Sequence, residues 1–417
     1  MASRQQTLFL LMIVALAFAT TTLTELRFGE LPIGVPEFIL LGCMLVHLPL
    51  GGGVHVEPGA NRFIVGLFLF FAATMPGFFS TLVSQGLLPD VMHNLLALAW
   101  MLVLFAYLQF GFDYRRGELD WLCRMVLLFS CLYFVICLAL AGVSPDMVFA
   151  TDDLVDLAEI RNEEMLAVER LAGFADNPNQ LGLHAIVALF FCLRFWRTNG
   201  MLLSTIAFAL IMATGVLTGS DSFIFGAGLM VGVAVVLGLL LSGSIYAVLL
   251  ILVPAAVGAF LLYRPLLVRV RDLTSANDQD QTRYLLWENG WLATLERPLI
   301  GWGPGNWSGK TGPLEFFEAH NSVIDYVSNS GLLGGVVLVG GLAALFFGAL
   351  RSRQATLFAG LCGIVFFALF HHTFRQPLMW LVMFYVTHHV WTERGEPGGG
   401  RRRRRRRGSR DAAPAAL

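Results

Sequence analysis

Long apolar runs dominate the chain and alternate with polar connections. A helix needs about 20 predominantly apolar residues to cross the hydrocarbon core of a bilayer, and twelve runs approach that length. They cover residues 7–23, 36–54, 63–82, 91–110, 121–141, 181–195, 201–217, 223–241, 245–263, 323–349, 355–370 and 378–391. The pattern predicts an all-α polytopic membrane protein with about twelve transmembrane helices. An alternative for the first run is a signal peptide, but twelve uncleaved spans with both termini on one side fit the charges better.

Two long polar segments separate groups of these runs. Residues 143–180 hold nine acidic and two basic side chains, and apolar residues there recur near helical spacing, which is typical of a helix lying along the membrane interface. The predicted organisation is five helices in residues 1–142, a first loop in 143–180, four helices in 181–263, a larger loop in 264–320, three helices in 321–391 and a disordered Arg-rich tail in 392–417. Structured loops of this length usually carry function.

Composition agrees with a membrane protein. Hydrophobic residues make up 56% of the chain and charged residues 14%, whereas a soluble domain carries about a quarter charged residues. The six cysteines fall in or beside apolar runs and form no CxxC pair, so neither a disulfide framework nor a thiolate metal site is predicted. The run Arg401–Arg407 could bind anionic lipid, although a low-complexity tail of no specific role is favoured.

Arginines in short loops predict the orientation, because cytoplasmic loops carry the excess of Lys and Arg. The short loops on one side hold only Arg27 and Arg375. The other side collects the Arg-rich tail together with Arg4, Arg62, Arg115, Arg116, Arg124, Arg194, Arg197, Arg351 and Arg353. Both termini are therefore predicted to be cytoplasmic, and both long loops lie on the outer face.

An arginine begins a predicted amphipathic helix in the second loop. Arg283 follows a polar run that offers helix caps, and Pro298 ends the helix. One helical face carries Tyr284, Trp287, Trp291 and Leu295. Spacing alone slightly favours an interfacial helix with aromatic anchors and an arginine that reaches the headgroups. The functional alternative is an arginine that binds a phosphate or pyrophosphate through its two-pronged guanidinium.

A histidine opens the helix that follows the same loop. Behind His320, a polar stripe enters the predicted membrane helix with Ser322, Tyr326, Asn329 and Ser330. Polar residues inside a membrane span suggest a functional site, and a histidine can act as a general base because its pKa lies near neutrality. The alternative is a hydrated histidine at the interface.

Other features favour structural interpretations. The GWGPGN segment could present backbone N–H groups to an anion, but a chain reversal is favoured. The pairs His371-His372 and His388-His389 fall on opposite sides in the predicted topology, and adjacent histidines point apart. We therefore predict no metal site.

At these residues the chain resembles the bacterial O-antigen ligase/polymerase superfamily. The matching pattern is an arginine before an aromatic residue, a P-L-x-G-x-G turn, and a His-Asn pair followed by G-x-x-G. Here it is carried by Arg283, Trp287, Pro298–Gly303, His320, Asn321, Gly331 and Gly334, with Arg170, Gly173 and Asn177-Pro178-Asn179 upstream. One departure stands out, because many members carry Ser-Arg where this chain has Gly219-Ser220-Asp221-Ser222.

The resemblance implies a GT-C-like membrane enzyme that performs metal-independent, inverting glycosyl transfer without a cofactor. His320 would deprotonate or orient the acceptor hydroxyl, and Arg283 would offset charge on the departing diphosphate. Arg170, Asn321, Trp287 and Asn179 would bind substrate. The implied partners are a glycan donor on undecaprenyl diphosphate, a glycan or lipid A core acceptor, and membrane lipids, with no nucleic acid. The location would be the bacterial inner membrane, with the long loops periplasmic.

Three alternatives remain at this point. A repeat-unit polymerase would use the same site and differ only in its acceptor, although a ligase is slightly favoured. A transporter or flippase of lipid-linked glycan predicts mid-membrane charges and half-to-half symmetry, which the sequence lacks. A membrane O-acyltransferase predicts a histidine deep in an apolar span, whereas His320 stands at a span boundary.

The orientation can be tested with alkaline phosphatase fusions, because that enzyme needs disulfides that form outside the cytoplasm. We expect a fusion after Gly309 to be active and a fusion after Arg353 to be inactive. The opposite pattern would invert the topology and place the second loop in the cytoplasm.

Overall fold

The computed structural model describes residues 4–21, 34–47, 61–86, 88–112, 114, 117–150, 170–175, 177–243, 278–308 and 318–392. In these residues helices predominate, and one short antiparallel pair of strands joins the ends of the first long loop. The elements are α1 (Arg4–Ala19), α2 (Val35–His47), α3 (Asn61–Ala72), α4 (Met75–Gln85), α5 (Pro89–Gly111), α6 (Glu118–Val143), η3 (Pro145–Met147), β1 (Phe149–Ala150), β2 (Arg170–Leu171), α8 (Pro178–Phe195), α9 (Met201–Leu217), α10 (Asp221–Leu241), α12 (Asp278–Glu296), α13 (Ser322–Arg351), α14 (Ala355–Ala368) and α15 (Pro377–Thr392).

Helices lie on eleven of the twelve predicted runs, and the run 245–263 lies outside the described residues. Six helical segments in the described part are long and apolar enough to cross a membrane: Asn61–Gln85, which comprises α3 and α4, together with α5, α6, α8, α10 and α13. The shorter apolar helices are α1, α2, α9 and α14. The all-α membrane class is therefore confirmed, while the count of twelve spans stays a prediction.

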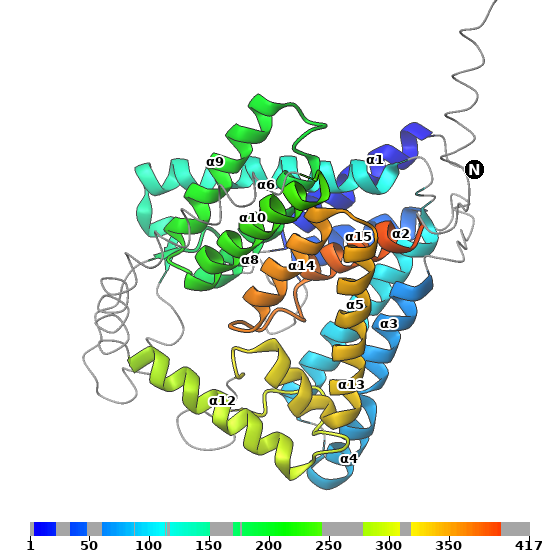
Figure 1. Ribbon diagram of the computed structural model, residues 1–417. Coiled ribbons are helices and arrows are strands. Elements are labelled where there is room, and N and C mark those ends of the chain that lie inside the picture. The colour runs from blue at the N-terminus through cyan, green and yellow to red at the C-terminus, as the bar shows by residue number, and fades with distance from the viewer. Residues whose placement is uncertain are drawn as a thin grey trace, which may run out of the picture.

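Helix α8 lies at the centre of the main hydrophobic core. Its residues from Leu181 to Cys192 are buried on every side of the helix, since α6, α9, α10, α14 and α15 all pack against it. A helix that is apolar all round is expected in such an interior position. Figure 1 shows α8 among the green and cyan helices, whereas α3, α5 and α13 run side by side in another part of the molecule.

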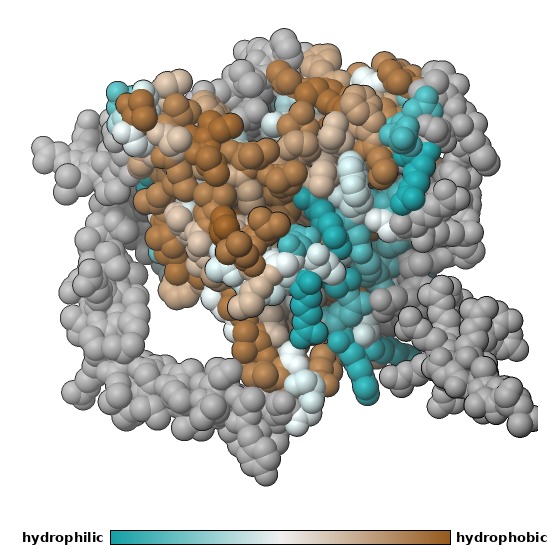
Figure 2. Space-filling view, turned by 90° about the horizontal axis from the view of Figure 1, so that it is seen from above, coloured by the Kyte–Doolittle hydropathy of each residue, from teal (hydrophilic) through white to brown (hydrophobic). Residues whose placement is uncertain are grey.

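The outer helices expose apolar side chains, as lipid-facing helices do. On α9, Met201, Leu202 and Leu203 are 78%, 74% and 66% exposed. Figure 2 shows a broad hydrophobic surface beside a narrower strip of hydrophilic residues. Exposed apolar area of this extent is unusual for a soluble monomer.

The P-L-x-G-x-G turn packs backbone against backbone on a kink in α13. The kink is at Gly331, whose φ of 61° and ψ of −158° interrupt the helical geometry. The amides of Trp302 and Gly303 donate to the carbonyls of Ser328 and Asn329 at 2.9 and 2.8 Å, and the amide of Leu332 donates to the carbonyl of Pro298 at 2.7 Å. Side chains at these glycines would block the approach: a Cβ on Gly331 would lie 2.5 Å from the carbonyl carbon of Leu299.

The same turn is held to α4 on its other side. A Cβ on Gly303 would lie 2.5 Å from the backbone of Phe78, and the Thr81 hydroxyl donates to the Trp302 carbonyl at 2.5 Å. The guanidinium of Arg297 lies 3.7 Å from the centroid of the Trp302 ring and donates to the Thr81 hydroxyl. The amides of Trp302 and Gly303 donate to α13 carbonyls rather than to an anion. The segment therefore forms the chain reversal that the sequence favoured.

The polar stripe of α13, interpreted from the sequence as a possible site lining, packs inside the protein. The Tyr326 hydroxyl donates to the Phe70 carbonyl at 2.8 Å, and the two rings stack with centroids 3.8 Å apart. That carbonyl lies where α3 ends before α4, and a helix end needs partners for its last carbonyls. The Ser330 hydroxyl donates to the Tyr326 carbonyl. Tyr326 therefore joins α13 to α3, while the Ser330 hydroxyl is bonded within α13.

We expect Gly331→Ala to destabilise the protein by about 1–3 kcal/mol or more, since a left-handed non-glycine residue costs that much before any overlap is counted. The matched control is Gly335→Ala, because the nearest atom to an added Cβ there is 3.8 Å away. The measurement is the fraction of detergent-solubilised protein that stays monodisperse after heating. Equal heat resistance of the two variants would contradict the backbone packing.

Candidate functional site

A buried imidazole lies where α14, α13 and α10 meet. His371 stands in the connection between α14 and α15 and is 6% exposed. Its Nε2 lies 2.9 Å from the hydroxyl oxygen of Ser222, in the first turn of α10. Its backbone carbonyl accepts a hydrogen bond from the Ser322 hydroxyl at 2.6 Å, and its ring packs on Phe367. Backbone and side chain are thus both fixed.

Three of the residues predicted from the sequence act electrostatically on this imidazole. The pKa of His371 is held well below its usual value, chiefly by burial and then by the charges of Arg283, His320 and Arg170. Such charge effects require proximity. The structure therefore brings together side chains from α12, from the segment before α13 and from β2. We call Arg170, Arg283, His320 and His371 the arginine–histidine cluster.

Arg170 is positioned by the turn that precedes α10. Its Nε donates to the Thr218 carbonyl at 2.7 Å, and its Nη2 donates to Oδ1 of Asn179 at 3.0 Å. A Cβ on Gly219 would lie 3.1 Å from the same Nε. Arg170 therefore lies against the turn where the superfamily pattern leads one to expect an arginine that this chain lacks.

Asn179 and Arg170 were each predicted to bind substrate, and the structure pairs them with each other. Asn179 is buried in the first turn of α8. Its backbone amide donates to the side-chain oxygen of Asn177, the N-cap of that helix. The cap fixes the start of α8 and hence the amide oxygen that meets Arg170.

The segment after Arg170 is anchored on α6. The Phe174 amide donates to the Tyr133 hydroxyl at 3.1 Å, and a Cβ on Gly173 would lie 2.6 Å from that hydroxyl. Gly173 also has a φ of +68°. Glycine at this motif position is therefore explained by close approach and backbone conformation.

Helix α12 presents Arg283 and Trp287 on the flank between a buried and an exposed face. The buried face packs closely at Gly290, because an added Cβ there would lie 2.5 Å from the hydroxyl oxygen of Ser308. The exposed face carries Tyr284, Trp291 and Leu295 at 66%, 53% and 57% exposure. That face suits the membrane interface, as the sequence indicated.

Trp287 turns toward the end of α14. It is half-buried, with its ring centroid 5.7 Å from that of Tyr284 and 6.0 Å from that of Phe370. Its indole N–H is buried without a hydrogen-bond partner among the described residues. Phe370 directly precedes His371, so Trp287 lies beside the arginine–histidine cluster.

His320 has an unusual backbone and is followed by a helix cap. Its φ of 49° lies in the left-handed region, which non-glycine residues enter rarely and often at functional sites. The side-chain oxygen of Asn321 accepts from the amides of Val323 and Ile324 at 3.0 and 3.2 Å. The structure thus gives Asn321 an N-cap role, and its contact with substrate stays a prediction.

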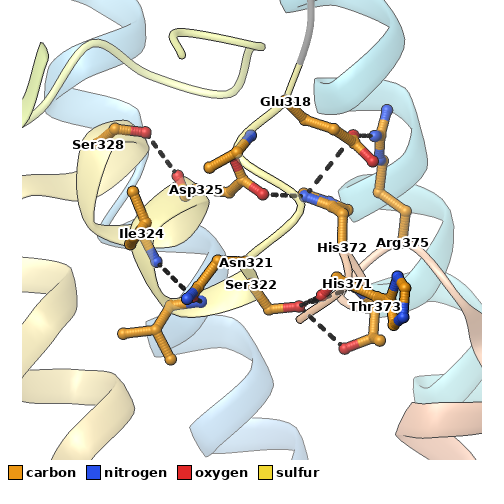
Figure 3. A network of polar contacts seen from close by, with 12 residues as sticks. Glu318, Asn321, Ser322, Ile324, Asp325, Ser328, His371, His372, Thr373 and Arg375 are labelled. Carbon is orange, nitrogen blue, oxygen red and sulfur yellow. Dashed lines mark hydrogen bonds and ion pairs between the residues drawn. The ribbon is translucent and has the colours of Figure 1, made fainter. Parts of the chain in front are cut away.

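A second polar network joins the start of α13 to the α14–α15 connection (Figure 3). Asp325 is 1% exposed and accepts from the Ala319 amide at 2.7 Å and from Nδ1 of His372 at 2.9 Å. Nearby, Glu318 pairs with Arg375. From the sequence, His371 and His372 were considered only as metal ligands, that role was rejected, and Asp325 was given no role. The available signal was a His pair and an acid at two predicted outer span ends.

The adjacent histidines point into different surroundings, as predicted, since His371 meets Ser222 and His372 meets Asp325. Within the part of the chain that the structure describes, no group of three or more His, Cys, Asp or Glu side chains is arranged to hold a metal ion.

Residues 206–339 match the family described as O-antigen ligase. This segment runs from α9 into α13 and contains Arg283, Trp287, the glycine turn, His320 and Gly331; Arg170 and His371 lie outside it. The match covers part of the chain and supports the resemblance to the O-antigen ligase/polymerase superfamily. Together with the apolar helices, it supports a membrane protein with a glycan-transferring function of the ligase/polymerase type. No curated protein matches the chain.

The lowered pKa of His371 predicts how stability depends on pH. In the unfolded chain a histidine titrates near 6.5, whereas folded His371 stays neutral to much lower pH. Its contribution is therefore complete above about pH 6.5 and is lost as the pH falls toward the folded-state value. Between pH 7.5 and 5.5 we expect the wild type to lose about 1.4 kcal/mol more stability than His371→Gln, measured by denaturant unfolding. Parallel pH dependence of the two proteins would show that folding does not lower the pKa of His371.

Proposed function

We propose that the protein transfers a glycan from undecaprenyl diphosphate to an acceptor hydroxyl at the periplasmic face of the inner membrane. The observation that supports this most is that Arg170, Arg283 and His320 are all close enough to the buried imidazole of His371 for their charges to lower its pKa. Two guanidinium groups beside a histidine suit an anionic leaving group and a hydroxyl nucleophile.

The proposed step is a direct displacement. The acceptor oxygen forms a bond to the anomeric carbon while the bond from that carbon to the diphosphate oxygen breaks, and the electron pair leaves with the diphosphate. His320 takes the proton from the acceptor hydroxyl, and Arg283 and Arg170 stabilise the charge that develops on the diphosphate. Attack opposite the leaving group inverts the anomeric configuration. Because the sugar–diphosphate bond is already activated, positioning and charge stabilisation suffice without a metal or cofactor.

Arg170 replaces the arginine missing from the turn before α10. Its hydrogen bonds to the Thr218 carbonyl and to Asn179 hold the guanidinium beside that turn. Asn179 then supports Arg170 and acts on substrate through it, while Asn321 caps α13 beside the base. Trp287 flanks the site with an indole N–H that has no other partner among the described residues.

The aromatic face of α12 supports a site at the membrane interface. Tyr284 and Trp291 are exposed on the helix that carries Arg283, and such residues are enriched at headgroup level. A donor whose lipid stays in the bilayer would deliver its diphosphate at this depth. We favour a ligase that uses lipid A core or another glycan acceptor; a repeat-unit polymerase would use the same site with a second lipid-linked chain.

The test is complementation of a deletion strain with wild type, His320→Ala, Arg283→Ala and Arg283→Lys. Loss of the general base should lower the transfer rate about 10²–10⁴-fold. Arg283→Lys should keep only part of the wild-type activity, because lysine lacks the two-pronged geometry of the guanidinium. Surface and lipid-linked polysaccharides are profiled on gels. Arg351→Ala, at the exposed far end of α13, is the matched control and should complement fully.

The profile also separates the alternatives. Accumulated long lipid-linked chains indicate a ligase, and single repeat units indicate a polymerase. Full complementation by His320→Ala and Arg283→Ala at normal protein level would refute the catalytic assignment and favour a transporter. Loss of activity when purified protein meets a chelator would refute the metal-free step.

A further inference from the structure

One buried carboxylate connects the two segments that carry the histidines of the cluster. Asp325 lies in the first turn of α13, and its oxygens bind different parts of the chain. Oδ1 accepts from the amide of Ala319 at 2.7 Å, and Oδ2 accepts from Nδ1 of His372 at 2.9 Å. Figure 3 shows His372 pointing toward Asp325, and the His371 side chain lies elsewhere in the view.

Each of these two partners of Asp325 is a sequence neighbour of a histidine of the cluster. Ala319 precedes His320, whose left-handed backbone needs support from its surroundings. His372 follows His371 directly. A parallel link is made by Ser322, whose hydroxyl donates to the His371 carbonyl and accepts from the Thr373 amide at 2.8 Å. The start of α13 and the α14–α15 connection are therefore held together at His371 and at the two residues that follow it.

We propose that Asp325 is a positioning residue that fixes His320 and His371 relative to each other in the transfer site. This rests on the proposed function, in which His320 is the base. Asp325 does not meet substrate; it acts through the backbone of Ala319 and the ring of His372. A burial this complete is costly for a carboxylate unless hydrogen bonds compensate, so both bonds are expected to persist. Placement matters because a shift of about 1 Å at a reacting group can cost roughly 100-fold in rate.

A neighbouring acid provides a matched control. Oε2 of Glu318 lies 3.7 Å from the same Nδ1 of His372, beyond hydrogen-bond distance, and the side chain is 21% exposed. Its closer partner is Arg375. Glu318→Gln therefore removes a negative charge near His372 and leaves both contacts of Asp325 in place.

The experiment uses full-length protein in membrane vesicles and, as donor, lipid-linked glycan extracted from the deletion strain. Initial transfer rates are measured against donor concentration. Asp325→Ala should lower kcat by roughly 10–100-fold with KM changed less than about threefold. Asp325→Asn keeps an acceptor for the Ala319 amide and should retain clearly more activity than alanine. Glu318→Gln should match the wild type within about twofold.

The hydrogen bond between Asp325 and His372 can also be removed by substituting His372. His372→Leu should lower kcat like Asp325→Ala, and His372→Asn should recover part of it, because its amide can reach the position of Nδ1. If Asp325→Ala fails to fold, this pair still decides the question. Equal kcat of His372→Leu and wild type would overturn the proposal.

A double substitution separates positioning from general stability. In a His320→Ala background, adding Asp325→Ala should change the residual rate by less than about twofold, since the base that Asp325 positions is already absent. Multiplied losses would overturn the proposal and assign Asp325 a structural role. If wild-type vesicles transfer no glycan, or if His320→Ala matches the wild type, the proposed function itself fails, which is a different result from an inert Asp325 substitution.

Discussion

Direct contact between two stretches of backbone holds the second loop to the membrane helices. The turn at residues 298–303 hydrogen-bonds to α13 where Gly331 breaks the helix, and glycine is required on both sides of the contact. A broken helix frees carbonyl and amide groups that cannot stay unpaired in an apolar environment. The turn supplies the missing partners. Because α12 leads directly into this turn, the contact also fixes the helix that carries Arg283.

The electrostatics of the cluster follow from burial. Two arginines and His320 act on an imidazole that is almost inaccessible, and a further proton on His371 would add charge where water cannot screen it. His371 therefore serves as a neutral hydrogen-bonding group among cations. A diphosphate entering this environment would meet positive charge already in place, which is the condition for stabilising a leaving group without reorganisation.

Local patterns allowed much of the fold and part of the site to be predicted. Apolar runs located helices such as α6 and α10, and the motif residues Arg283 and His320 are both close enough to His371 to affect its pKa. The partner of Asp325 could not be predicted, because His372 is 47 residues away and no local period connects them. Nor did hydropathy separate α8 from the lipid-facing helices, since complete burial and lipid exposure both select apolar residues.

The turn before α10 lacks the arginine that the superfamily pattern leads one to expect, and it lies against Arg170. Gly219 has a φ of +58°, and a Cβ there would lie within 3.1–3.5 Å of the Arg170 side chain. A bare backbone at this point lets Arg170 reach the Thr218 carbonyl, and Asn179 aligns the other end of the guanidinium. A long side chain projecting from the turn would compete for the same space. The absence of a side chain at Gly219 therefore leaves room for the Arg170 side chain, which brings a positive charge to the turn from β2.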